Sequence, residues 1–455
     1  MSTPHDFVAV GVGPFNLGLA ALTDPIDDLD GVFLDENPTF DWHPGMLLEG
    51  THLQTPFLAD LVTLADPTSR YSFLNFLKHT GRLYSFYIRE SFFPLRVEYN
   101  EYCRWVADQL PAVRFGHRVT EITHDGDAYS VHSRHLHTGE THTHRAHRLV
   151  LGTGTPPYVP EACRGLEGLA VHSGQYLGRR DELRAADSLT VVGSGQSAAE
   201  IFLDLLRGVD DHGYALTWVT RAPRFYPLEY TKLTLEMTSP EYTDYFHALA
   251  PAQRDALIAA QASLYKGIDS TLIDEIFETL YVKSRGSGRT ARLMTNSEVT
   301  GVDTDTQPGR FRLALRQREQ ERRFTHDTQG LILATGYRHT VPEFLAPIAD
   351  RIRWDSSGRF DVARDHTVDH GGGEIFVQNA ELHTHGLVAP DLGMGAHRNS
   401  WIIRALAGRE VYPVERAIAF QEFGVPEEAA PGVPPPQPPQ AEPAPAHPHR
   451  EVPIR

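Results

Sequence analysis

The sequence predicts an α/β fold with two Rossmann-like dinucleotide-binding domains of three layers each, the second inserted in the first. Two glycine-rich segments carry this prediction, Gly11-Val12-Gly13 and Gly193-Ser194-Gly195. Each follows an apolar, β-branched run and leads into a helix-compatible stretch, which is the strand–turn–helix context of a dinucleotide fingerprint. A length of 455 residues allows two or three domains. Two such segments in one chain indicate that a flavin and a nicotinamide are held against each other.

The first domain is predicted to comprise residues 1–165 and 326–424. Its βαβ unit starts with a buried strand at 7–10, continues with a helix that ends near residue 22, and returns with an apolar strand at 31–36. An aromatic-rich stretch follows, and the chain then alternates between apolar and polar residues as antiparallel strands do. We expect helices at about 72–79 and 99–110, and antiparallel strands over 118–151.

The second domain is predicted at residues 186–325, with its strands near 188 and at 215–221. An insertion at about 225–285 has apolar residues at helical spacing and is expected to be a mostly helical substrate region. Two small-residue segments, 152–154 and 334–337, are expected where the chain crosses between the domains.

The C-terminal segment 425–455 differs from the rest in composition. It contains 11 prolines in 31 residues and almost no aromatic side chains. Such a segment cannot bury enough apolar surface to offset its ordering entropy, so we expect a solvated, disordered tail. A proline-rich docking ligand is the alternative.

Charge and cysteine content restrict the class of protein. The net charge is −17, which argues against nucleic acid and anionic membranes as partners. The two cysteines, Cys103 and Cys163, form no C-x-x-C pair, which disfavours a disulfide-relay flavoenzyme and fits a reducing, cytoplasmic location. No signal peptide and no run long enough to span a bilayer is visible.

The first fingerprint is expected to hold FAD. Gly11 permits a tight turn, and Gly13 lets the backbone approach a pyrophosphate at the start of a helix. Asn16 takes the place of the third glycine. Asp35 lies 24 residues after Gly11, where a ribose-binding acid belongs, and Glu36 is the neighbouring candidate.

The second fingerprint is expected to hold NADPH. Gly193 and Gly195 repeat the two glycine roles, and Gln196 and Ser197 follow at the helix start. The strand that returns beside this motif is followed by Arg221. An arginine in place of an acid suits a 2′-phosphate and therefore favours NADPH over NADH.

A pair of histidines, His383 and His385, raises the question of a metal. Two residues at i and i+2 on an expected strand point the same way. No cysteine or carboxylate cluster completes a site nearby, so we predict no metal.

The order of several motifs resembles that of the siderophore-associated N-hydroxylating flavin monooxygenases, which include the lysine, ornithine and diamine N-hydroxylases. The resemblance covers residues 7–420. It rests on Gly11-x-Gly13-Pro14-x-Asn16-Leu17, Trp42-His43-x-Gly45-Met46, Leu53-Gln54-x-x-Phe57, Asp66-Pro67-Thr68-Ser69, Gly193-x-Gly195-Gln196-Ser197, Ala334-Thr335-Gly336-Tyr337 and His383-Thr384-His385-Gly386.

The resemblance implies an N-hydroxylation carried by the flavin. NADPH would reduce FAD, O2 would add to give a C4a-hydroperoxyflavin, and a neutral terminal amine would attack the distal oxygen. No catalytic side chain is required, and Gln54 would lie beside the flavin ring. A homo-oligomer, dimer or tetramer, is expected. The further cofactor-binding residues that it implies are Trp42, His43, Thr335, Gly336 and His383.

The chain departs from the resemblance where amino-acid hydroxylases bind a substrate carboxylate. Their lysine is Ala59 here, and an asparagine and a serine of the ornithine group become Leu235 and Gly393. An unpaired carboxylate in a closed pocket costs several kcal/mol. The sequence therefore favours a diamine, cadaverine or putrescine, whose distal ammonium would need Glu236 or Asp391.

Two alternatives stay open from the sequence. Another cation such as Lys266 could replace the absent lysine. The enzyme would then be a lysine or ornithine hydroxylase with altered anchors. A flavin-bound redox sensor or scaffold without turnover belongs to a different class, and both intact fingerprints speak against it.

Overall fold

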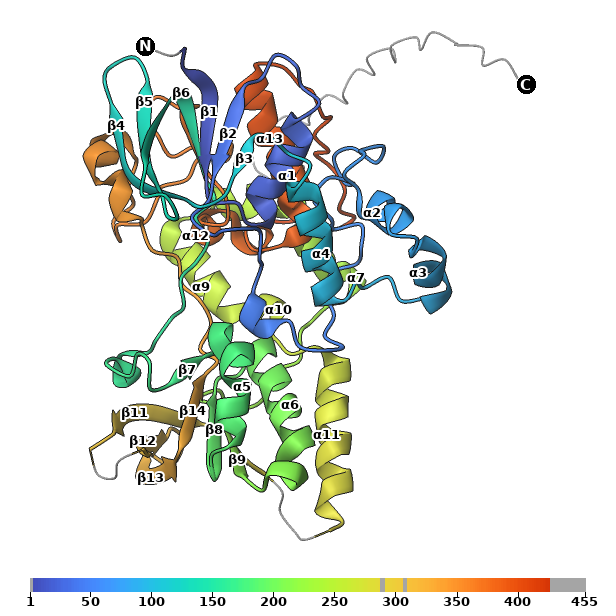
Figure 1. Cartoon of the computed structure of the whole chain (residues 1–455), viewed down its shortest axis with the longest axis vertical. Coiled ribbons are helices and arrows are strands. Elements are labelled where there is room, and N and C mark those ends of the chain that lie inside the picture. Colours follow the sequence, from blue (N-terminus) through green and yellow to red (C-terminus); the bar gives the residue numbers. More distant parts are fainter. Residues whose placement is uncertain (1–2, 287–290, 306–308, 426–455) are drawn as a thin grey trace.

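The computed structural model describes residues 3–286, 291–305 and 309–425. Figure 1 shows two units, one above the other. We call the upper one, which contains the chain's first strand, the N-terminal unit, and the lower one the inserted unit. The predicted tail falls, apart from residue 425, outside the described residues.

The N-terminal unit is built on one mixed sheet in the order β3-β2-β1-β6-β5-β4, with β15 paired to β6. β1, β2, β3 and β15 run parallel to the C-terminal half of β6, whereas β4 and β5 form an antiparallel meander with its first half. Its strands are β1 (His5–Val10), β2 (Gly31–Leu34), β3 (Val113–Arg114), β4 (His117–His124), β5 (Tyr129–His135), β6 (Thr141–Leu151) and β15 (Ile375–Val377).

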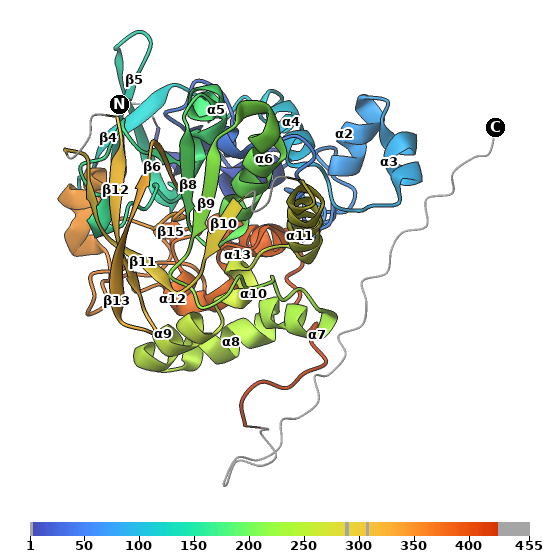
Figure 2. The same ribbon diagram turned by 90° about the horizontal axis from the view of Figure 1, so that it is seen from below.

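Alternate residues of these strands enter two different apolar clusters, because successive side chains of a strand point to opposite faces. Phe7 and Ala9 pack under α1 (Pro14–Thr23), α4 (Arg96–Ala107) and α13 (Gly395–Ala407). Val8 and Val10 face the β4–β5 hairpin and the 3-10 helix η5 (Glu343–Arg351). The unit therefore has three layers. Two short helices, α2 (Phe73–His79) and α3 (Leu83–Arg89), project from its side in both views (Figures 1 and 2).

The inserted unit has an all-parallel sheet in the order β10-β9-β8-β14-β7. Helices pack on one face, and the antiparallel sheet β11–β13 packs on the other. Its strands are β7 (Val171–His172), β8 (Ser188–Val192), β9 (Ala215–Val219), β10 (Ala291–Met294), β11 (Ser297–Asp303), β12 (Phe311–Gln317), β13 (Arg322–Thr328) and β14 (Gly330–Leu333), and its helices are α5 (Tyr176–Arg184), α6 (Gln196–His212) and α11 (Ser270–Ser284). All of them lie in sequence between β6 and β15, so the predicted insertion is confirmed.

The predicted return to the first domain at residue 326 is wrong. β14 pairs with β8 and β7 of the inserted unit, so the chain leaves that unit only after Leu333. The apolar run of β14 completes a buried parallel sheet, which the sequence could not distinguish from a strand of the first sheet. The two crossing segments then meet: the Tyr158 N–H donates to the Gly336 carbonyl at 2.9 Å.

Short helices pack near the junction of the two units, and those of residues 225–285 agree with the mostly helical region predicted there. α8 and α9 pack on α12 of the N-terminal unit, whereas α11 packs on α6 of the inserted unit. They are α7 (Lys232–Leu235), η4 (Glu236–Thr238), α8 (Pro240–Ala248), α9 (Pro251–Ala260), α10 (Ser263–Lys266) and α12 (Leu382–His385). His383 and His385 lie on α12, so the strand expected for them is wrong. Nowhere in the described residues does a helix combine the length and apolarity that a membrane crossing requires.

Candidate active site

The first glycine loop is held in shape by Asn16. Its Nδ2 donates to the Gly11 carbonyl at 2.7 Å, and its Oδ1 accepts from Gln378 Nε2 at 2.6 Å. Asn16 is 1 % exposed, so it fixes the loop from behind instead of contacting a ligand. Gln378 directly follows β15, which ties the loop to the end of the sheet.

The two acids after β2 have different surroundings. Asp35 Oδ2 accepts from the Val12 N–H of the glycine loop at 2.6 Å, so it lies at the position expected of a ribose ligand. Glu36 instead forms an exposed ion pair with Arg118. Of the two predicted candidates, Asp35 is the one beside the nucleotide loop.

Gly13 and Gly195 each border the space that a phosphate would fill. α1 begins after Gly13 and α6 after Gly195, and neither helix start carries a side-chain cap. A Cβ on Gly13 would meet no atom within 4 Å, and one on Gly195 only the Lys266 carbonyl at 3.5 Å. Gly11, in contrast, has φ +87° and its Cβ would lie 2.4 Å from the Gly152 carbonyl oxygen. Both loops therefore fit a dinucleotide pyrophosphate.

Positive charge gathers beside the second loop. Arg221 follows the end of β9, as predicted. Burial and, to a smaller extent, the nearby charges of Arg221 and Arg338 lower the pKa of the Lys266 ammonium group. Three cations next to a bare helix start suit a polyanionic ligand such as a 2′-phosphorylated nicotinamide nucleotide.

Aromatic rings line the junction of the two units. The His43 ring lies 4.8 Å from Trp42 and 5.4 Å from Tyr337 of the second crossing segment. His43 adopts a left-handed backbone conformation, with φ 52°. Burial, with a smaller effect of Arg96, lowers the pKa of His43 to about 4, so this imidazole is neutral at neutral pH. Trp42 also packs edge-on against Tyr99 of α4, so its role is at least partly structural.

A polar network joins the flavin-side segment to the second fingerprint. Gln54 Nε2 donates to Gln196 Oε1 at 3.2 Å, and the same oxygen accepts from the Asp269 N–H at 2.9 Å. Gln196 Nε2 donates to Glu200, whose carboxylate receives both Arg96 Nη atoms at 2.7 Å. Arg96 and Glu200 were not identified from the sequence, since nothing local marks two residues 104 positions apart as partners.

Three of the predicted substrate positions come together. A Cβ on Gly393 would lie 3.8 Å from that of Ala59 and 3.3 Å from Asp391 Oδ1, which accepts from the Gly393 N–H. Burial raises the pKa of the Asp391 carboxyl group. The segment that carries Ala59 is fixed by the neighbouring buried Asp60, which accepts hydrogen bonds from the N–H groups of Val62, Thr63 and Phe73.

Other predicted site residues lie elsewhere. Glu236 accepts from the Phe420 and Gln421 N–H groups at 3.0 and 2.9 Å, so its carboxylate already has backbone partners, and its contact with an ammonium stays a prediction. Leu235 precedes it at the end of α7 and lines no described pocket. His383 binds the Phe360 carbonyl, and Thr335 donates to the Tyr158 carbonyl, which gives both a structural partner.

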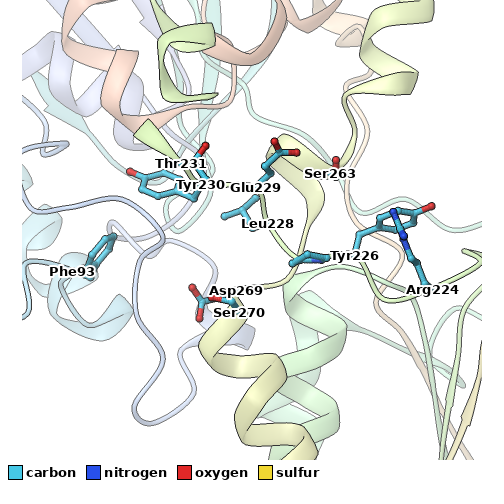
Figure 3. A pocket seen from close by; sticks show the side chains of 11 residues that line it. Phe93, Arg224, Tyr226, Leu228, Glu229, Tyr230, Thr231, Ser263, Asp269 and Ser270 are labelled. Carbon is cyan, nitrogen blue, oxygen red and sulfur yellow. The ribbon is translucent and has the colours of Figure 1, made fainter. Parts of the chain in front are cut away.

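A pocket of about 570 Å³ opens between the units. Figure 3 shows Tyr230 and Glu229 on one side and Asp269 on the other, with Phe93 at one end. Burial and, to a smaller extent, the charge of Asp391 raise the pKa of the Tyr230 phenol. The pocket therefore adjoins the Ala59–Asp391 region. Asp269 lines the pocket, and its backbone N–H donates to Gln196 of the second fingerprint. The acidic and aromatic part of this lining suits a small organic cation, and Arg224 lies at the end opposite Phe93 (Figure 3).

This chain is similar to known proteins over most of its length. The family model described as L-lysine 6-monooxygenase/L-ornithine 5-monooxygenase matches residues 3–339. The chain belongs to this family.

Within the lysine/ornithine monooxygenase family, the similar proteins include enzymes named for diamines. A putrescine N-hydroxylase of Shewanella oneidensis is 49% identical over 92% of this chain and 84% of its own length. An alcaligin biosynthesis enzyme of Bordetella pertussis is 48% identical over 93% of this chain and 92% of its own. The FAD-bound crystal structure of a cadaverine monooxygenase of desferrioxamine biosynthesis from Erwinia amylovora has a TM-score of 0.91 and 54% identity, covering 93% of this chain and 99% of its own.

The open space at Gly13 and Gly195 yields a paired prediction. Gly13→Ala should fold normally but bind FAD at least about tenfold more weakly, because the methyl group enters the pyrophosphate space. Gly195→Ala should keep FAD and lose NADPH affinity to a similar extent. Flavin content and NADPH titration of the two purified variants check this, and full flavin retention by Gly13→Ala would contradict the assignment of the first loop.

The buried ion pair yields a second prediction. Glu200→Gln leaves the Arg96 guanidinium, whose side chain is 12 % exposed, without its counter-charge, and should cost about 3–5 kcal/mol of stability. Replacing both residues by methionine should cost less than this single change. Denaturant unfolding measures both, with Asp327→Asn of the exposed Arg312–Asp327 pair as control, expected to change stability by less than about 1 kcal/mol. Equal effects of Glu200→Gln and the control would refute the interpretation.

Proposed function

We propose that this chain N-hydroxylates one terminal amine of a small aliphatic diamine, cadaverine or putrescine, in hydroxamate siderophore biosynthesis. It is an N-monooxygenase with FAD and NADPH as cofactors. The single observation that carries the diamine proposal is the junction of Ala59, Gly393 and Asp391, where the described residues offer a carboxylate, while the cation that acts on Asp391, Arg398, is 2 % exposed and paired with Glu381. The names of the similar putrescine and cadaverine enzymes support the same substrate class.

Electrostatics distinguishes a diamine from an amino acid at this junction. The carboxylate of lysine or ornithine would face Ala59 without a positive partner and close to the Asp391 carboxylate. Two like charges in a partly buried site raise the cost of binding further. The distal ammonium of a diamine instead gains a charge-assisted hydrogen bond with Asp391.

The placement of Lys266 argues against the amino-acid alternative. Its electrostatic neighbours are Arg221 and Arg338, and its carbonyl borders Gly195. Lys266 therefore belongs with the second fingerprint and does not replace the cation that is absent at Ala59.

The side chains of this chain bind, orient and exclude water. When bound, FAD reduced by NADPH supplies the activation of O2 and the oxygen transfer. Asp391 holds the distal amine in its charged form, so that the other end, which reacts only as a neutral amine, is directed away from this carboxylate. Gln54 and Gln196 fix the segment beside the flavin, and the neutral His43 adds no positive charge to the reaction region.

A substrate panel tests the proposed function. NADPH oxidation in air and hydroxylamine formation should both be stimulated by cadaverine or putrescine, and much less by lysine or ornithine. Hydroxylation of amino acids alone would reject the diamine pocket. A flavin-bound protein without hydroxylamine product from any of the four amines would support the redox-sensor alternative.

The Asp391 carboxylate makes a pH-dependent prediction. Only the ionised carboxylate attracts an ammonium, and burial raises the pKa of Asp391, so the KM for diamine should rise as the pH falls toward that raised pKa. Asp391→Asn should raise KM about tenfold or more at neutral pH and remove this acid-side rise.

Glu229→Gln is the matched control, because Glu229 is an exposed acid of the same pocket. It should change KM less than about fivefold. A larger effect of Glu229→Gln than of Asp391→Asn would move the ammonium contact from the Gly393 loop to the pocket wall.

A further inference from the structure

The last described residues of the chain, 413–425, connect the N-terminal unit to the helices beside the pocket. We call them the C-terminal strap. Where the strap begins, the Tyr412 hydroxyl donates to the Leu22 carbonyl of α1 at 2.7 Å, and His397 of α13 hydrogen-bonds to the Glu415 carbonyl at 3.0 Å. The strap, drawn in red in Figure 2, then passes α7. It therefore reaches from α1 and α13 to the short helices at the junction of the units.

Two glutamates of these short helices hold the strap. Glu241 Oε1 accepts from the N–H groups of Ile418 and Ala419 at 2.6 and 2.9 Å. Glu236 accepts from the N–H groups of the next two residues at 3.0 and 2.9 Å. Two carboxylates thus bind four consecutive backbone N–H groups, and hydrogen bonds to a charged acceptor are about twice as strong as neutral ones.

Apolar packing contributes little to this attachment. The side chains of Ile418 and Phe420 are 49 % and 95 % exposed. Further along, Phe423 packs edge-on against Tyr242 of α8, with ring centroids 5.0 Å apart. The position of the stretch that carries the four N–H groups therefore depends mainly on the two carboxylates.

The helix α7 in turn depends on the strap. None of its four residues is buried, so it has no apolar anchor of its own. It follows directly after Glu229–Thr231, which line the pocket. The strap binds α7 from outside, because Gln421 Nε2 donates to the Leu233 carbonyl at 2.6 Å. A change in the strap would therefore reach the pocket wall within a few residues.

We propose that Glu236 and Glu241 are positioning residues, which act through the strap to hold α7 and the adjoining pocket wall in the arrangement that binds the amine. This inference rests on the proposed function. The 3-10 helix η4, which begins at Glu236, lies beside η6 (Gly386–Val388), and η6 leads to the loop of Asp391. The strap would thus fix one wall of the pocket relative to the proposed ammonium acceptor, without a contact to either glycine loop.

Amide hydrogen exchange of the flavin-loaded chain tests the link between the strap and α7. A chain that ends after Tyr412 lacks the strap, and its amides at 229–238 should exchange about tenfold faster or more, since α7 loses its external hydrogen bonds. A chain that ends after Val425 keeps the strap and is the control, with unchanged exchange at 229–238. Equal exchange in the two shortened chains overturns the proposal, whichever amine the enzyme uses.

Steady-state kinetics tests the effect on amine binding. Glu236→Ala and Glu241→Ala should each raise the KM for cadaverine or putrescine about fivefold or more, because each removes two charge-assisted hydrogen bonds from the strap. Flavin content and NADPH affinity should stay within about twofold, since both glycine loops are untouched. Glu422→Ala is the matched control: Glu422 is an exposed acid of the strap itself, and its replacement should change KM less than about twofold.

The two glutamates distinguish positioning from direct contact with the substrate. If Glu236→Ala raises KM and Glu241→Ala does not, Glu236 contacts the amine itself and the positioning role is refuted. If the unaltered chain gives no hydroxylamine with either diamine, the proposed function fails, and hydrogen exchange alone then decides whether the strap holds α7.

Discussion

The ion pair between Arg96 and Glu200 sets the relation between the two units on which the whole site depends. Each unit has its own sheet, the two crossing segments meet at the hydrogen bond between Tyr158 and Gly336, and Met46 and Leu48 extend the apolar cluster of the inserted unit. Arg96 lies at the first residue of α4 and Glu200 within the first turn and a half of α6. Two charge-assisted hydrogen bonds with the Glu200 side chain only 2 % exposed hold the second glycine loop against the flavin-side segment.

A buried pair of this kind contributes geometry more than net stability, because desolvation offsets most of its Coulombic attraction. The contribution of this ion pair is the orientation that it gives to α6. The two hydrogen bonds of the Arg96 guanidinium fix both the distance and the orientation of α6. Gln196 connects α6 to Gln54, because its Nε2 donates to Glu200 and its Oε1 accepts from Gln54 Nε2. A nicotinamide carried by α6 and a flavin beside Gln54 would then be positioned by the same network.

Local sequence signals predicted the elements well and the long-range partners poorly. The glycine loops, Asp35 and the position of Arg221 were predictable because each role depends on a few residues of one βαβ unit. The sheet to which β14 belongs was not predictable, since an apolar four-residue strand fits the parallel part of either sheet. The partners of Glu236 were not predictable for a related reason: the N–H groups of Phe420 and Gln421 belong to a segment 184 residues later. Asp391 was predicted as a candidate from the sequence, but the fold was needed to show that its neighbour Gly393 lies next to Ala59.

The loop that carries Asp391 is shaped by the protein itself and not by the ligand. Arg398, 2 % exposed, donates to the Val388 and Ala389 carbonyls at 2.9 and 2.7 Å and pairs with the buried Glu381 at 3.1 Å. A guanidinium held by a carboxylate and two carbonyls cannot move without leaving a buried charge unpaired, so the loop it binds is stiff. The acceptor that we propose for a distal ammonium, Asp391, would thus stand at a fixed distance from the flavin side of the site. With a rigid acceptor at one end and a fixed reaction centre at the other, the site would distinguish two diamines by the number of carbon atoms between their amines.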